Sequence, residues 1–185
     1  MGGLVASVLV ATGFVAYAVA ISRQVPASRY ANLILYASPA KVPQFGPLAR
    51  LGGGASITSA MLAGSPAVVN WFESGCVACQ AELGTFASVA DRHGWRIRFL
   101  GVDINDPSPA LALTMVRRAK ADYPVAQAPG LGSISLATRF GVGDLPATVF
   151  VDSSGDILGE VLGKIPPSEL MALFGNLVAG RPLNS

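Results

Sequence analysis

Residues 67–82 read AVVNWFESGCVACQAE and contain both cysteines of the chain, Cys76 and Cys79. Residues 67–72 form a short apolar run of residues that favour strands, which predicts a buried strand. Residues 77–93 follow with apolar side chains at helical spacing, which predicts a helix. The C-x-x-C motif is therefore expected at a strand–helix junction, with the first cysteine at the start of the helix.

This position suits redox chemistry. Unpaired backbone N–H groups and the helix dipole stabilise a thiolate on Cys76, and Cys79, one turn along, can attack a mixed disulfide and release a reduced substrate. A zinc site needs two further ligands, but the chain has no other cysteine and one histidine, so no metal centre is expected. A structural disulfide or two unrelated buried thiols are the alternatives, and a bridge across so short a loop removes little unfolded-state entropy. The motif predicts a thioredoxin-like redox site.

The residues after this motif continue an α/β pattern. Gly52, Gly53 and Gly54 predict a hairpin turn, because no Gly-Lys-Ser/Thr follows to form a phosphate-binding loop. Further strands are expected over 97–102, 148–151 and 157–162, and helices over 107–121, 133–140 and 167–178. The order predicts a mixed sheet with a parallel half and an antiparallel edge.

The N-terminal segment has the composition of a membrane span. The chain is 51% hydrophobic and only 13% charged, with a mean hydropathy of +0.51, which is high for a soluble domain. Residues 1–22 carry no charge, and residues 4–21 read LVASVLVATGFVAYAVAI. Eighteen helical residues span about 27 Å, enough to cross a hydrocarbon core. We expect a transmembrane anchor over 1–22; the alternative is a signal segment cleaved after Ala18-Val19-Ala20.

The charged residues are distributed unevenly along the chain. Residues 1–72 contain four basic side chains and no acidic one, and no clustered basic face is present, so nucleic acid binding is excluded. We expect a linker over 23–42, which either contacts anionic lipid or is a solvated spacer, a domain over 43–180 and a tail over 181–185. The positive-inside rule favours a cytoplasmic domain, whereas the dithiol chemistry favours the extracytoplasmic side, which is our expectation.

The stretch 68–82 resembles the active-site segment of membrane-anchored thioredoxin-like proteins of the TlpA, ResA and CcmG group. These proteins show a strand that ends in an aromatic pair, a C-x-x-C motif and a glutamate three residues after the second cysteine. A second landmark, GVGDLPATVFVD over 141–152, is also present, and the resemblance covers about residues 43–180. It implies a thioredoxin-like α/β fold, a central mixed sheet flanked by helices, preceded by one transmembrane helix.

The resemblance also implies roles for individual residues. Cys76 is expected to attack the substrate and Cys79 to resolve the mixed disulfide, so the pair forms the redox-active disulfide. Glu82 is expected to exchange a proton with Cys79; the alternative is a solvated helix residue. Pro146 is expected to be a cis-proline that binds substrate backbone together with Leu145. No cofactor is implied.

Three departures from the family pattern bear on specificity. Gly75 stands where the family usually has a tryptophan, the aromatic pair is Trp71-Phe72 rather than Phe-Trp, and the two residues between the cysteines lack the common proline. They leave thiol exchange possible but remove a flat aromatic flank, so partner docking is expected to depend more on the Pro146 loop. The uncharged Val77-Ala78 pair favours a reductant over an oxidant.

The sequence therefore predicts a membrane-tethered thiol–disulfide oxidoreductase of the extracytoplasmic side, or a secreted one if the signal is cleaved. Its expected partners are disulfide-containing client proteins, such as maturing cytochromes c or metalloenzymes, and a membrane thiol relay that supplies electrons. The N-terminal sequence also resembles the MauD branch. The alternatives are a non-catalytic tethered module and a peroxidase on the related AhpC/TSA peroxiredoxin scaffold, which needs a threonine where this chain has Glu73.

Overall fold

The computed structural model describes residues 30, 32–128 and 131–185. Its strands are β1 (Leu33–Lys41), β2 (Ala49–Arg50), β3 (Ala67–Phe72), β4 (Arg98–Ile104), β5 (Val125–Ala128), β6 (Ala147–Val151) and β7 (Asp156–Leu162). Its helices are η1 (Ser59–Leu62, a 3₁₀ turn), α2 (Val77–His93), α3 (Pro109–Ala119), α4 (Leu131–Arg139) and α5 (Pro167–Val178).

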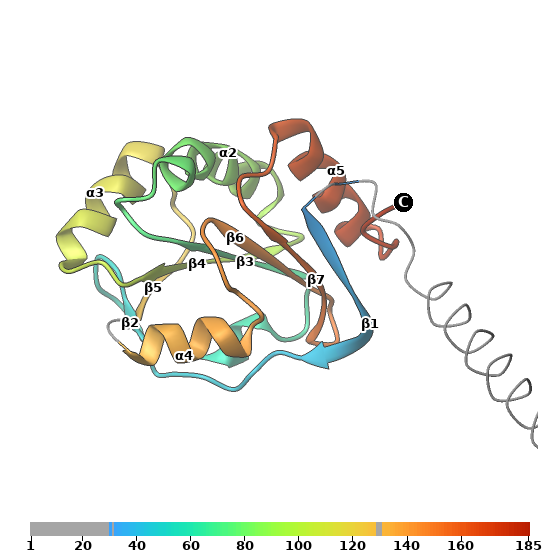
Figure 1. Ribbon diagram of the computed structural model, residues 1–185, viewed down its shortest axis with the longest axis horizontal. Coiled ribbons are helices and arrows are strands. Elements are labelled where there is room, and N and C mark those ends of the chain that lie inside the picture. Colours follow the sequence, from blue (N-terminus) through green and yellow to red (C-terminus); the bar gives the residue numbers. More distant parts are fainter. Residues whose placement is uncertain (1–29, 31, 129–130) are drawn as a thin grey trace, which may run out of the picture.

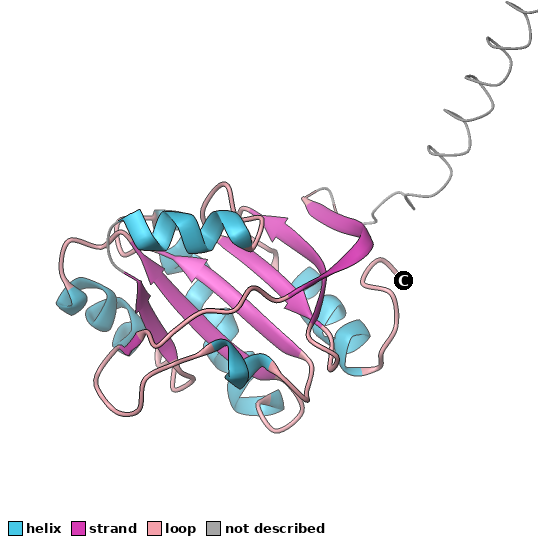
Figure 2. Ribbon diagram, turned by 90° about the horizontal axis from the view of Figure 1, so that it is seen from below, coloured by secondary structure: helices cyan, strands magenta, loops and turns pink. Residues whose placement is uncertain are grey.

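The strands form one mixed sheet in the order β1-β7-β6-β3-β4-β5-β2. Strands β3, β4 and β5 are parallel, and β6 and β7 are antiparallel, so the expected division into a parallel half and an antiparallel edge is confirmed. Helices α2, α3 and α5 cover one face of the sheet and α4 covers the other (Figure 1, Figure 2). This is the expected thioredoxin-like arrangement.

Both faces of the sheet are packed with apolar side chains. On the α4 face, the Trp71 ring contacts Phe140 at a centroid distance of 5.3 Å. On the opposite face, Phe174 of α5 contacts Phe86 of α2 and Phe99 of β4 at 5.9 and 5.5 Å. Strand β3 lies between the two layers with every residue buried, which explains its unbroken apolar run.

The expected linker over 23–42 is wrong in its second half, because Leu33–Lys41 is strand β1 and pairs antiparallel with β7. The domain therefore begins before residue 43. Strand β1 lies at the sheet edge, most of its residues are partly or fully exposed, and its register shifts between Leu35 and Ala40. Edge position and irregularity remove the alternating pattern and tolerate Pro39 within the strand.

The two ends of the domain also differ from expectation. The tail over 181–185 packs on the domain: Leu183 is buried, and the Asn176 side chain donates to the carbonyl oxygens of Leu183 and Ser185, both at 3.1 Å. Strands β2 and β5, which the sequence did not predict, are two and four residues long. Elements this short carry little periodic signal.

The expected transmembrane segment over 4–21 lies outside the described residues. Within the part of the chain that is described, none of the helices combines the length and apolarity needed to cross a bilayer.

Candidate active site

The two cysteines lie where β3 gives way to α2. Cys76 is the N-cap residue of α2 and forms a disulfide with Cys79, with an S–S distance of 2.02 Å and a Cα–Cα distance of 5.2 Å. The backbone N–H of Cys79 donates to the Cys76 sulfur at 3.1 Å. The same N–H group can stabilise a Cys76 thiolate after reduction, because it is one of the donors that a helix start leaves unpaired.

The two sulfurs differ in accessibility. Cys76 is partly exposed, whereas Cys79 is 2% exposed. Gly75 is exposed and a Cβ at that position would meet nothing within 4 Å, and Val77 is 78% exposed. A large partner can therefore reach Cys76 from outside, while Cys79 can react only with its neighbour in the motif. This arrangement fits the roles predicted for the two cysteines.

Glu82 lies one turn beyond Cys79 and is 2% exposed, so the alternative of a solvated helix residue is wrong. Its Oε1 accepts a hydrogen bond from the Ile165 N–H at 2.6 Å, and its Oε2 has no partner among the residues that the structure describes. Burial raises the pKa of Glu82 to about 7, although the Ile165 N–H, the Asn70 amide and the Lys164 charge oppose the rise. A carboxyl group with this pKa can both accept and release a proton near neutral pH.

The surroundings of Glu82 are polar but uncharged on the sheet side. Asn70 is 3% exposed, and its side chain donates to the Ala147 carbonyl oxygen at 3.4 Å. Thr148 is opposite Asn70 in the β3–β6 ladder, and none of the described residues forms a hydrogen bond with its buried hydroxyl. Asn70 thus connects the Glu82 site to the first residue of β6, directly after Pro146.

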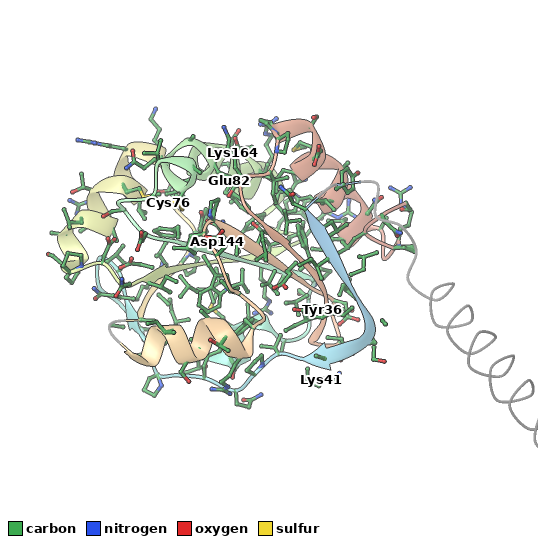
Figure 3. All side chains as sticks on the ribbon, in the orientation of Figure 1. Tyr36, Lys41, Cys76, Glu82, Asp144 and Lys164 are labelled. Atoms are coloured by element: carbon green, nitrogen blue, oxygen red, sulfur yellow. A yellow bond between two sulfur atoms is a disulfide. The ribbon has the colours of Figure 1, made fainter. Side chains whose placement is uncertain are left out.

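The loop before β6 also contributes to the site. The Leu145–Pro146 peptide bond is cis, as the resemblance implied. Leu145 is partly buried against the same apolar cluster as both cysteines, and the Pro146 carbonyl oxygen accepts from the Gly163 N–H at 2.7 Å. Figure 3 shows Asp144 of this loop on the same side of the molecule as Cys76 and Glu82, away from Tyr36 and Lys41 on β1.

Two acidic residues near the motif were missed as site residues. Asp106 accepts three hydrogen bonds from Ser74, and Asp103, which is buried, interacts with Asp106. An acidic residue inside the apolar run that follows Arg98 is the sequence signal that marks Asp103. Within the described ranges, no group of three His, Cys, Asp or Glu side chains could hold a metal ion.

The comparisons with known proteins agree with this geometry. The sequence model of the thioredoxin-like domain family matches residues 54–177. A search of the curated proteins finds no match. Among solved structures, DsbF of MTB, determined in mixed oxidised and reduced forms, is 25% identical with a TM-score of 0.60, over 72% of this chain and 92% of that one.

Two other solved structures share the fold. A secreted disulfide oxidoreductase of Mycobacterium tuberculosis, homologous to E. coli DsbE, is 22% identical with a TM-score of 0.61, over 72% of this chain and 93% of that one. A DsbF homologue from Corynebacterium diphtheriae is 21% identical with a TM-score of 0.67, over 83% of this chain and 98% of that one. The structural neighbours thus belong to the class that the sequence resemblance indicated.

Proposed function

Because the chain belongs to the thioredoxin-like domain family and is a thiol–disulfide oxidoreductase, we propose that it reduces protein disulfides, outside the cytoplasm and tethered to a membrane. The observation that carries the direction of the reaction is the charge around the C-x-x-C motif. Glu73 precedes Cys76 by three residues and Glu82 follows Cys79 by three, while Asp106 binds Ser74, two residues before Cys76. Acidic neighbours disfavour a thiolate, and a dithiol whose thiolate is not strongly stabilised readily transfers its electrons.

The reaction follows from the accessibility of the two sulfurs. The Cys76 thiolate attacks one sulfur of a client disulfide, and the other client sulfur leaves as a thiolate and takes up a proton. Cys79 then gives its proton to Glu82 and attacks the Cys76 sulfur. The Cys76–Cys79 disulfide forms, the second client sulfur leaves, and two electrons have passed to the client. Regeneration requires two electrons from a donor dithiol.

The membrane tether is supported by the sequence of residues 4–21 and by where the chain enters the sheet. Leu33 pairs with Val161, Val161 with Thr148, and Thr148 with Asn70, so these residues form one row across the sheet. The chain therefore enters the domain near the edge where β3 ends and the cysteines lie. A tether at residue 30 would hold Cys76 on the same side as a membrane thiol relay, which we propose as the electron donor.

Client choice follows from the exposed surface beside Cys76. Because Gly75 and Val77 leave Cys76 without a bulky aromatic neighbour, an extended client segment can bring its disulfide to Cys76. The backbone of that segment would pair with the Pro146 loop. Haem-attachment cysteines of apocytochromes c and cysteines of maturing metalloenzymes are clients of this kind. The secreted relative from M. tuberculosis supports the extracytoplasmic assignment.

The experiment uses the Cys79→Ser variant, which cannot resolve the mixed disulfide, in membranes of the native host. We expect discrete covalent adducts that dithiothreitol releases, with a membrane protein and extracytoplasmic dithiol proteins among them. The Cys76→Ser, Cys79→Ser double variant is the matched control and should trap nothing. Adducts formed equally by the control, or consumption of hydrogen peroxide without any disulfide reduction by the wild type, would contradict the proposal.

A further inference from the structure

The loop that leads into Cys76 is held at Ser74 by two side chains, Asp106 and Gln80. The Ser74 N–H donates to both oxygens of Asp106, at 3.2 and 3.1 Å, and the Ser74 hydroxyl donates to Oδ1 at 2.7 Å. From the other side, the Gln80 side chain donates to the Ser74 carbonyl oxygen at 2.7 Å. Ser74 is two residues before Cys76, so Asp106 fixes the backbone from which the attacking sulfur is presented.

A second carboxyl group lies beside this contact without a donor of its own. Asp103 is opposite Phe72 in the parallel β3–β4 ladder and is 1% exposed. In the part of the chain that the structure describes, no donor reaches either of its oxygens. Among the described residues, the charged groups that act on it are Asp106, from the loop before α3, and Glu73, from the loop after β3, and both are acidic.

An ionised carboxylate in this position would be buried without a cation or a hydrogen-bond donor, next to a second carboxylate. The neutral acid avoids both costs and supplies the missing bond itself, because its O–H can donate to Asp106. Burial and the Asp106 carboxylate accordingly raise the pKa of Asp103 to about 8.

We propose that Asp103 is a positioning residue of the redox reaction: as a neutral acid it donates to Asp106, and it thereby holds the carboxylate that fixes Ser74 and presents Cys76. The inference requires only that Cys76 reacts, and not that the protein acts as a reductant. When Asp103 loses its proton, the two carboxylates repel each other, and a further negative charge lies beside the segment from Phe72 to Ser74 that leads into Cys76.

The direction of the effect follows from the charges. Reduction of the disulfide produces a thiolate on Cys76, and an ionised Asp103 disfavours that thiolate. The reduced form of the wild type is therefore penalised at pH 9, where Asp103 is ionised, and not at pH 6.5, where it is neutral. In Asp103→Asn the amide stays neutral at both pH values and can still donate to Asp106.

The experiment measures the equilibrium constant of the full-length protein with glutathione at pH 6.5 and pH 9. At pH 6.5 the equilibrium constants of Asp103→Asn and the wild type should agree within about twofold. At pH 9 the equilibrium constant of Asp103→Asn should favour the reduced form about three- to tenfold more than that of the wild type, which corresponds to half to one pKa unit. Asp91→Asn, the same change at an exposed position on α2, should follow the wild type at both pH values. Equal behaviour of Asp103→Asn and wild type at both pH values, or an equal shift at both, would overturn the inference.

A second measurement separates this inference from the proposed function. In the Cys79→Ser background, the rate at which iodoacetamide alkylates Cys76 reports thiolate formation without any disulfide exchange. Adding Asp103→Asn should raise that rate several-fold at pH 9 and leave it unchanged at pH 6.5. A protein that alkylates in this way but never exchanges with glutathione would refute the proposed function alone, whereas identical rates with and without Asp103→Asn would refute the role of Asp103.

Discussion

At the turn from β6 to β7, Asp152 accepts hydrogen bonds from the Ser154 and Asp156 N–H groups at 2.8 and 2.9 Å, and Asp156 pairs with Lys41 at 2.9 Å. At the opposite end of these strands, where β3 ends, Glu82 and Asp103 are buried, and three of their four carboxyl oxygens accept no hydrogen bond from the described residues. The acidic residues of the turn are satisfied by donors or a cation, whereas those beside the cysteines are not.

The difference shows that the fold loses stability by burying carboxyl groups beside the cysteines but not at the turn. A buried carboxyl group without donors lowers stability and raises its own pKa. At the turn such an arrangement would bring no benefit, and the backbone supplies the donors. Beside Cys76 and Cys79 it supplies groups that exchange protons near neutral pH, which thiol–disulfide chemistry requires. We define the active-site edge as the region where β3 ends, with the cysteines, Glu82 and Asp103, and the turn edge as the β6–β7 turn with Lys41. Substitutions at the active-site edge are expected to change activity and pH-dependent stability, whereas those at the turn edge should change stability alone.

The largest effect is expected from Cys76→Ser, which removes the only accessible sulfur of the motif. Disulfide reduction should fall to the rate of the thiol buffer alone, while the fold remains intact, because a bridge across so short a loop contributes little to stability. Insulin reduction and thermal unfolding measure the two quantities. Residual catalysis through Cys79 would contradict the burial-based assignment of roles.

Asn70→Asp should have the next largest effect, because it puts a second carboxyl group beside Glu82. At pH 8 both groups tend to ionise in a buried site, and the free energy of unfolding should fall by about 3 kcal/mol. At pH 5 the loss should be smaller. Denaturant unfolding at the two pH values tests this, with Thr148→Val as control: that change removes the unpartnered hydroxyl of the neighbouring residue in the β3–β6 ladder and should be pH-independent.

Glu82→Gln should slow resolution of the mixed disulfide about tenfold, because the proton acceptor for Cys79 is lost. It should also raise the free energy of unfolding above pH 7 and weaken its dependence on pH. The raised pKa of Glu82 means that its own contribution to stability is fully present below about pH 4.5 and is lost as the pH rises through about 7. The glutamine variant should lose this slope and be roughly 1–3 kcal/mol more stable than the wild type at pH 8. Parallel pH–stability curves for the two proteins would contradict the assignment.

At the turn edge, Asp152→Ala should cost about 1 kcal/mol, the contribution of a side chain that caps backbone N–H groups. Disulfide reduction per folded molecule should not change. Thermal unfolding combined with the insulin assay measures both. A loss of activity comparable to that of Glu82→Gln would mean that the two edges are not independent.

Lys41→Ala should have the smallest effect. The Lys41 side chain is 70% exposed, and exposed ion pairs contribute about 0–1 kcal/mol. Unfolding in urea at low and high salt tests this, because screening should erase even the small difference. A salt-independent loss above that range would indicate a structural role for the β1–β7 contact.

The sequence was most informative where local and tertiary signals agree. The bounds of β3, α2 and α5 coincide with the expected ones, because burial, capping residues and periodicity point to the same positions. Strand β1 was assigned to the linker because an exposed edge strand with a register shift has no apolar periodicity. Among the site residues, the cysteines and Glu82 are marked by spacing along one helix.

Asp103 could not be assigned from the sequence in the same way. Its relation to Cys76 depends on β4 lying parallel to β3 in a register that places it opposite Phe72. Residues in separate elements come together only through that pairing, and no local pattern reports it. The acidic residue within an apolar strand was visible in the sequence, but nothing in the sequence indicates that Asp106, in the loop after that strand, binds Ser74.

The redox potential of the Cys76–Cys79 pair at pH 7 decides whether the protein acts as a reductant. Equilibration of the full-length protein with glutathione buffers gives this value without knowledge of the client. If the acidic surroundings make the pair a reductant, the potential should lie well below about −180 mV, the range of protein disulfide isomerase, and towards that of thioredoxin. A value well above about −180 mV, towards that of DsbA, would show that the pair is an oxidant and would refute the proposed reductase function.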